Sequence, residues 1–151
     1  MDIGKSDTAL DAWSASDLYG SWRVISAKGV LVDSDGTRTE SEHALEGVLI
    51  FTPDHRMIAF VLHPGREPGQ SDDAKLKLFG SMVAYTGRFT LEPDRYLVTI
   101  DWSSTALNEN QEQVRLFRMD GDSLRIEVPE HSSIFNPAQR TSNTLLAVRE
   151  R

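Results

Sequence analysis

The feature that most constrains the fold is a pair of β-rich segments joined by Asp120-Gly121. Residues 112–119 (EQVRLFRM) and 122–128 (DSLRIEV) carry apolar side chains at roughly alternate positions. Alternation of this kind is typical of strands with one face in a core. An Asp-Gly pair between two such segments is typical of the tight turn of a β-hairpin. The sequence therefore predicts two adjacent antiparallel strands here.

Six further segments have the composition of strands, at residues 21–30, 44–51, 56–63, 83–91, 96–102 and 143–149. Short breaks, TPDH at 52–55 and EPDR at 92–95, separate two pairs of them. Proline in the second place of such a break is typical of tight turns. The polar stretches 31–43, 103–111 and 129–142 are predicted as loops. Most of the strands are therefore expected to be joined as consecutive hairpins.

One stretch, residues 71–82, is predicted as a helix. Ser71 is a good N-terminal cap, and Asp72 and Asp73 suit the positive end of the helix dipole. We expect this helix to cover one end or one side of the β structure.

Eight antiparallel strands close into an all-β barrel just wide enough to hold one small ligand. A two-sheet sandwich is the alternative. The 151 residues suit one domain, which we assign to residues 18–151. Residues 1–17 are expected to form an N-terminal tail, in which Ser14 and Asp17 give a weak capping signal for a short helix.

Charge and composition exclude several classes of partner. Lys and Arg number 16 and Asp and Glu number 23, which gives a net charge of −7. Such a chain repels a phosphate backbone, so nucleic acid is not expected as a partner. No signal peptide is evident in residues 1–10, and the longest apolar run, residues 57–62, is too short to span a bilayer. A cytoplasmic protein without a membrane partner is the default expectation.

Neither a metal nor a cofactor is expected. The chain has no cysteine, which excludes thiolate metal sites, disulfides and a cysteine nucleophile. No two of its four histidines lie three to five residues apart, so none shows the spacing of metal ligands. The glycines are dispersed rather than gathered in a phosphate-binding loop, and no serine lies in a Gly-x-Ser-x-Gly context.

Gly20-Ser21-Trp22, at the start of the first strand, resembles the Gly-x-Trp of lipocalins. In that family the tryptophan plugs the closed end of the barrel and an arginine of the last strand stacks on it, for which Arg149 is the matching residue. Segments 18–27, 47–66, 84–89 and 112–126 resemble, in order, the bacterial and fungal lipocalin-like domain family.

Two positions depart from that family's pattern. Val98 and Thr99 stand near the places where members often carry paired histidines, and Ala147 stands where a tryptophan is expected.

Tyr85, Gly87 and Phe89 share one face of their strand by the two-residue period. The resemblance points this face inward, so that Gly87 makes room, Tyr85 offers a hydroxyl and Phe89 lines the wall of a ligand cavity. Plain packing of a small core is the other interpretation.

Gln113, Arg115 and Phe117 also share a face, and alternation alone does not decide whether it points inward. The resemblance favours Arg115 inside. A buried guanidinium needs a carboxylate partner, such as Glu46 or Asp101, or an anionic ligand group. The other interpretation is an outward Arg115 on a solvated strand.

Trp102 is expected on the face of Tyr96, Val98 and Ile100, where it roofs a ligand or caps the core. His63 ends its strand and is a candidate acid or base, because its reference pKa is near neutrality. A surface histidine at a strand end is the plainer interpretation.

The leading hypothesis is binding of a small, mainly apolar molecule in an enclosed pocket. Its candidate ligand-binding residues are Tyr85, Phe89, Tyr96, Trp102, Arg115 and Phe117. The alternative is a cofactor-free cyclase, isomerase or dehydratase acting on a polyketide- or terpenoid-like substrate, with His63, Tyr85 and Arg115 as catalytic groups. A third interpretation is a protein-interaction module with a filled core. The sequence leaves the oligomeric state open.

Overall fold

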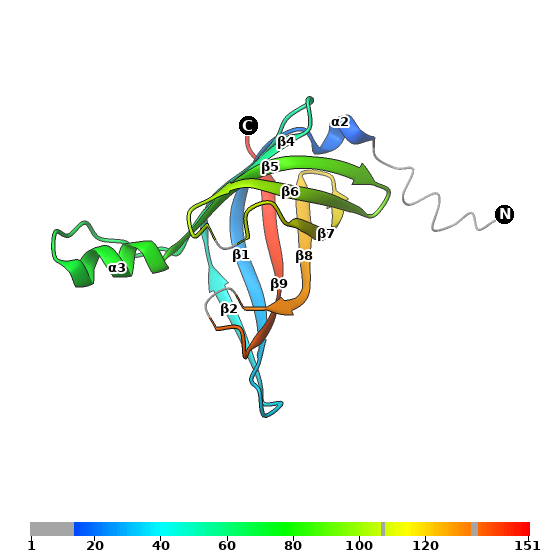
Figure 1. Ribbon diagram of the computed structural model, residues 1–151. Coiled ribbons are helices and arrows are strands. Elements are labelled where there is room, and N and C mark those ends of the chain that lie inside the picture. Colours follow the sequence, from blue (N-terminus) through cyan, green and yellow to red (C-terminus); the bar gives the residue numbers. More distant parts are fainter. Residues whose placement is uncertain (1–13, 107, 134–135) are drawn as a thin grey trace.

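The computed structural model describes residues 14–106, 108–133 and 136–151, and its strands form one antiparallel sheet that closes on itself (Figure 1). The strands are β1 (Gly20–Val32), β2 (Arg38–Ala44), β3 (Glu46–Phe51), β4 (Arg56–Leu62), β5 (Met82–Glu92), β6 (Arg95–Ser103), β7 (Glu112–Asp120), β8 (Ser123–Ser132) and β9 (Arg140–Arg149). The helices are α2 (Ala15–Leu18) and α3 (Asp72–Gly80). No helix in this described part of the chain is long and apolar enough to cross a membrane.

The sheet is an eight-stranded barrel, because β2 and β3 act as one strand. Only Leu45 separates them, and they lie end to end against β1, with β3 on residues 20–23 and β2 on residues 26–32. The opposite edge of β1 pairs with β9, which closes the barrel. The predicted all-β barrel is therefore confirmed, and the sandwich alternative is wrong.

Two segments predicted as loops contain substantial stretches of strand. The chain at 31–43 continues β1 to Val32, turns over five residues, and returns as β2. The chain at 129–142 likewise extends β8 and β9 beyond their predicted ends. Every residue of β2 is exposed. A strand that runs past the core needs no apolar alternation, so its sequence resembles that of a loop.

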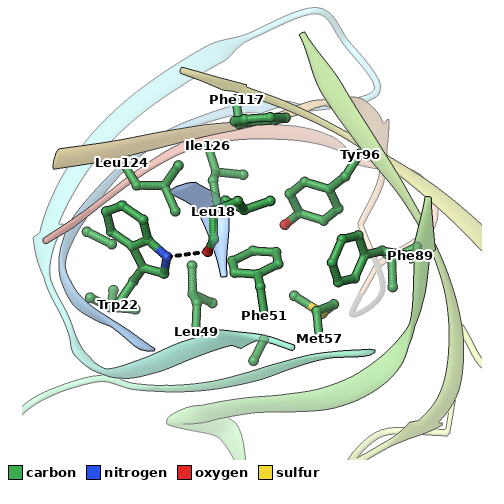
Figure 2. Packing of buried hydrophobic residues seen from close by; sticks show 14 of the residues in the cluster. Leu18, Trp22, Leu49, Phe51, Met57, Phe89, Tyr96, Phe117, Leu124 and Ile126 are labelled. Carbon is green, nitrogen blue, oxygen red and sulfur yellow. Dashed lines mark hydrogen bonds between the residues drawn. The ribbon is translucent and has the colours of Figure 1, made fainter. Parts of the chain in front are cut away.

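The core fills one end of the barrel with aromatic rings (Figure 2). The ring of Phe51 packs edge-on against Phe89 and Tyr96, with centroids 5.5 and 5.3 Å away. Tyr96 also meets Phe117 at 6.2 Å. The two edge-to-face pairs of Phe51 are favourable beyond the area they bury.

Helix α2 and Trp22 close that end. The Ser14 N–H donates to the Asp17 carboxylate at 2.7 Å, as the capping signal predicts. Leu18 and Trp22 are fully buried, and the indole N–H donates to the Leu18 carbonyl at 2.9 Å (Figure 2). The Arg149 guanidinium lies 4.1 Å from the centre of the Trp22 ring. The arrangement expected from Gly20-Ser21-Trp22 is confirmed.

Gly47 is required by both its backbone and its surroundings. Its φ of +121° is one that L side chains rarely adopt, and a Cβ there would lie 2.0 Å from the Phe60 carbonyl oxygen of the paired strand. Only glycine lets β3 and β4 approach at this point.

Helix α3 begins as predicted, since the Ser71 hydroxyl accepts from the Ala74 N–H at 3.1 Å. The expectation that it covers the barrel is wrong. It stands to one side of the barrel in Figure 1, and none of its residues is buried. Its leucines alternate with Lys75 and Lys77, so no continuous apolar stripe forms. Leu76 is 70% exposed.

Candidate ligand-binding site

Four residues on neighbouring strands form a row on the inner surface of the barrel, away from the closed end. Gly29 of β1 pairs with Ser41 of β2 and with Asn143 of β9, and Asn143 pairs with Val128 of β8. A Cβ on Gly29 would lie 2.9 Å from the Asn143 amide oxygen and 3.3 Å from the Ser41 hydroxyl, so these side chains share a face. Asn143 lies four residues before the buried Ala147 and therefore on the same face of β9, which is the inner one. We call Ser41, Gly29, Asn143 and Val128 the inner row.

A pocket of about 600 Å³ lies along β1, β2, β8 and β9, and the whole inner row lines it. The charged residues that flank the inner row along these strands, Lys28, Glu40, Glu42 and Glu127, also contribute to its lining. Tyr85, Phe89 and Trp102 are absent from that lining. The pocket that the structure presents is therefore more polar than the one expected, and its walls are different.

Phe89, Tyr96 and Phe117 lie inside the barrel, in the packed core. Phe89 is 2% exposed and stacks on the His55 ring at 5.0 Å. Tyr85 is half-buried against this core, opposite Ala59 of β4 and Ser103 of β6. These four candidates thus have inward positions, and Tyr85 is the least buried of them.

Trp102 lies on the outside, and the expectation that it shares the face of Tyr96 and Ile100 is wrong. The β5–β6 register shifts between Thr86 and Gly87, so that Ile100 pairs with Gly87 but Trp102 pairs with Thr86. The extra residue, Asp101, reverses the alternation. Trp102 is 65% exposed.

Arg56 holds the outside of this bulge. Its guanidinium donates to the Asp101 carboxylate at 2.7 Å and to the Thr86 hydroxyl at 3.1 Å, and it lies 5.6 Å from the centre of the Trp102 ring. Trp102 and Asp101 therefore belong to an outer-surface cluster and have no part in the barrel interior.

Arg115 points inward and is only 8% exposed, opposite the buried Tyr96 of β6. Its guanidinium donates to the Val114 carbonyl at 3.0 Å, and no ion pair joins it to another described residue. The expected partners are wrong. Asp101 pairs with Arg56, and Glu46 is exposed.

The Tyr96 side chain is almost completely buried, and its hydroxyl points toward the middle of the barrel (Figure 2). Burial raises the pKa of Tyr96 well above its usual value, the nearby Tyr85 raises it further, and Arg115 lowers it. At neutral pH Tyr96 is therefore an uncharged donor and supplies no negative charge to Arg115.

His63 is exposed at the end of β4, with its ring edge-on to that of His43 at 5.7 Å. No described hydrogen bond or ring contact joins His63 to Tyr85 or Arg115, whereas Tyr85 and Arg115 both lie near enough to Tyr96 to affect its pKa. Within residues 14–106, 108–133 and 136–151, no group of three or more metal-ligating side chains is present.

The sequence analysis missed the inner row. Ser41 lies within a segment predicted as a loop, and Val128 and Asn143 flank another. A small polar residue in such a segment does not indicate that its side chain points into the barrel. The inner row follows from the register of the β1–β2 and β8–β9 hairpins, which both continue through their polar ends.

Comparison with known proteins returns one family. No curated protein and no solved structure matches the chain. The model of a family described as a lipocalin-like domain matches residues 19–150, nearly the whole chain. That match agrees with the closed barrel, the buried Trp22 and the stacked Arg149. The chain belongs to the lipocalin-like domain family.

Proposed function

We propose that this barrel binds a small, mainly apolar molecule in its interior. A lipocalin-like barrel is a binding type of fold, and the two ends of this one differ. One end is filled by Leu18, Trp22 and the aromatic core, whereas the other carries the pocket along the inner row. The filled end gives rigidity, and the other end offers room.

The pocket is the observation that carries the proposal. Its volume of about 600 Å³ falls within the roughly 300–1,000 Å³ typical of small-molecule sites. Val128 lines it, and the inward Leu145 packs beside it against the core. Ser41 and Asn143 are the polar members of the inner row, and their side chains can orient a ligand. This mixture suits an apolar molecule with a small polar part.

Binding is favoured over catalysis by the placement of the candidate groups. An acid–base mechanism needs its two groups within hydrogen-bond reach of one substrate. His63 neighbours His43 at an exposed strand end, while Arg115 is buried beside Tyr96. We therefore rank a cyclase, isomerase or dehydratase activity second.

A neutral fluorescent probe, N-phenyl-1-naphthylamine, tests the proposal. It should bind the wild-type protein saturably and be displaced by small apolar molecules. Val128→Trp fills the pocket and should weaken probe binding by about tenfold or more, which corresponds to ~1.4 kcal/mol. Arg125→Trp is the matched control, because it adds the same ring to an exposed position of the same strand.

Both variants should unfold in urea near the wild-type midpoint, so that a binding change reports on the pocket. Saturable binding that Val128→Trp leaves unchanged would place the ligand elsewhere. The absence of saturable binding by the probe and by every apolar competitor would contradict the proposed function.

A further inference from the structure

Arg115 is a buried charge without a counter-charge among the described residues. It is more than nine-tenths buried, and the only described hydrogen bond of its guanidinium is to the carbonyl of its own neighbour, Val114. A guanidinium cannot lose its proton to avoid the cost of burial. Leaving such a group unpaired is strongly unfavourable, so it requires an anion.

No described side chain near it supplies that anion. Asp101 is committed to Arg56 on the outer surface, at 2.7 Å. Tyr96, the cross-strand neighbour of Arg115, stays protonated because burial raises its pKa. Within the part of the chain that the structure describes, the negative charge that Arg115 requires is therefore missing.

The register connects Arg115 to the pocket. Leu116 of β7 pairs with Glu127 of β8, so Arg115 and Val128 are the next residues along the two strands. Both point inward, and Val128 belongs to the inner row that lines the pocket. Arg115 is not itself part of that lining, but it adjoins Val128 on the inner surface and so borders the pocket.

We infer that Arg115 binds the carboxylate of a small apolar acid, whose hydrocarbon part occupies the pocket along the inner row. This inference rests on the proposed function and specifies its ligand class. A planar guanidinium pairs with a carboxylate through two parallel hydrogen bonds.

A single negative charge fits this site better than a double one. One guanidinium balances one charge, whereas a phosphate monoester carries about −1.5 to −2 at neutral pH. The strand residues that flank the inner row include three acids, Glu40, Glu42 and Glu127, and one base, Lys28, so the net charge around the pocket opposes a second negative charge. These charges favour a monocarboxylate over a phosphate ester.

Decanoic acid and decan-1-ol form a matched pair of probes, since they differ mainly in the charged end. Each is titrated against wild-type protein that carries N-phenyl-1-naphthylamine. Wild type should prefer the acid by about tenfold or more. Arg115→Leu should lose that preference and still bind the alcohol, and Arg115→Lys should keep part of it. Arg125→Leu, which removes an exposed arginine of β8, should behave as wild type.

Stability gives a second measurement that does not depend on competition. Arg115→Leu removes an unpaired buried charge, so without ligand it should be at least as resistant to urea as wild type. Decanoic acid should raise the urea midpoint of wild type and leave that of Arg115→Leu unchanged. A variant that is much less stable than wild type would indicate that the protein itself pairs the charge, and would overturn the inference.

The two levels of proposal fail differently. Equal affinity of wild type for the acid and the alcohol contradicts the carboxylate inference and leaves the proposed function standing. Preference for decyl phosphate over decanoic acid contradicts the charge argument. Failure of the acid, the alcohol and the fluorescent probe to bind contradicts the proposed function, and the inference with it.

Discussion

Replacing Trp22 by alanine should remove a large part of the stability of this protein. The side chain is completely buried at the closed end of the barrel, where its indole N–H donates to the Leu18 carbonyl at 2.9 Å. Large-to-small changes of buried aromatic residues cost about 3–5 kcal/mol. That is a large share of the ~5–15 kcal/mol by which a domain is stable.

Part of this loss is shared with Arg149. Its guanidinium lies 4.1 Å from the centre of the Trp22 ring, and an arginine placed over an indole gains about 0.5–2 kcal/mol. Arg149 also donates to the Tyr19 carbonyl at 3.0 Å and to the Asp17 carbonyl, and these bonds hold helix α2 over the barrel end. Arg149→Ala should therefore cost about 1–3 kcal/mol, less than Trp22→Ala.

The assay is urea denaturation of wild type, both single variants and the double variant. The double variant should lose less than the sum of the two single losses, by about 0.5–2 kcal/mol, because either change alone already breaks the stacking. Arg38→Ala, at an exposed position of β2, controls for the loss of a positive charge. Losses that add to within about 0.3–0.5 kcal/mol would refute the stacking argument.

Two further predictions concern the backbone and the response to acid. Gly47→Ala should lower the free energy of unfolding by about 3 kcal/mol in the same urea assay. Gly36 is also at positive φ but has open space around it, so Gly36→Ala should cost only about 1 kcal/mol. Equal losses would contradict the steric argument. The hydrogen bond from Arg151, with the charges of Arg151 and Arg149, lowers the pKa of Asp122 in the folded protein. The stability that the ionised Asp122 contributes is therefore fully present above the ordinary carboxyl pKa of ~3.9. That stability is lost as the pH falls through the lower pKa of the folded state. Between about pH 5 and pH 2 the urea midpoint of wild type should consequently fall more than that of Asp122→Asn, and parallel curves would show that this cluster contributes nothing.

The closed end of the barrel could be predicted because its signals are local and strong. Gly20-Ser21-Trp22 and Arg149 lie near opposite ends of the sequence. Both belong to strands in which the alternation of apolar residues indicates which side chains point inward. Trp22 and Arg149 are direct cross-strand partners. The turn after Asp120 was readable for a similar reason, since Gly121 adopts the positive φ that such turns require.

The direction of Trp102 could not be predicted, because alternation carries no information across a bulge. Nothing in the sequence of β6 marks Asp101 as the extra residue. The position depends on the partner strand, where a Cβ at Gly87 would lie 2.2 Å from the Thr99 carbonyl oxygen. The close approach of β5 and β6 at Gly87 lies beside the register shift, and the shift moves Trp102 to the outer surface.

Arg115 shows the opposite case, in which alternation is regular but its phase is ambiguous. Gln113, Arg115 and Phe117 alternate with Val114 and Leu116, so each face of β7 holds at least one apolar residue. The pairing of Tyr96 with Arg115 decides the phase, because Tyr96 belongs to a strand whose inward face is unmistakably apolar. The inward direction of the Arg115 side chain therefore follows from the neighbouring strand β6, and the sequence of β7 alone does not indicate it.

The part of the barrel that we propose to bind a ligand is also the part that resembles loops in sequence, and one physical cause explains both facts. A filled core requires large apolar side chains, and their alternation in the sequence predicts both the strand and its inner face. A surface that must leave space for another molecule selects small or polar residues such as Gly29, Ser41 and Asn143, which carry no such signal. We propose that the ligand completes the core of this barrel and that its negative charge balances Arg115, which has no counter-charge among the described residues.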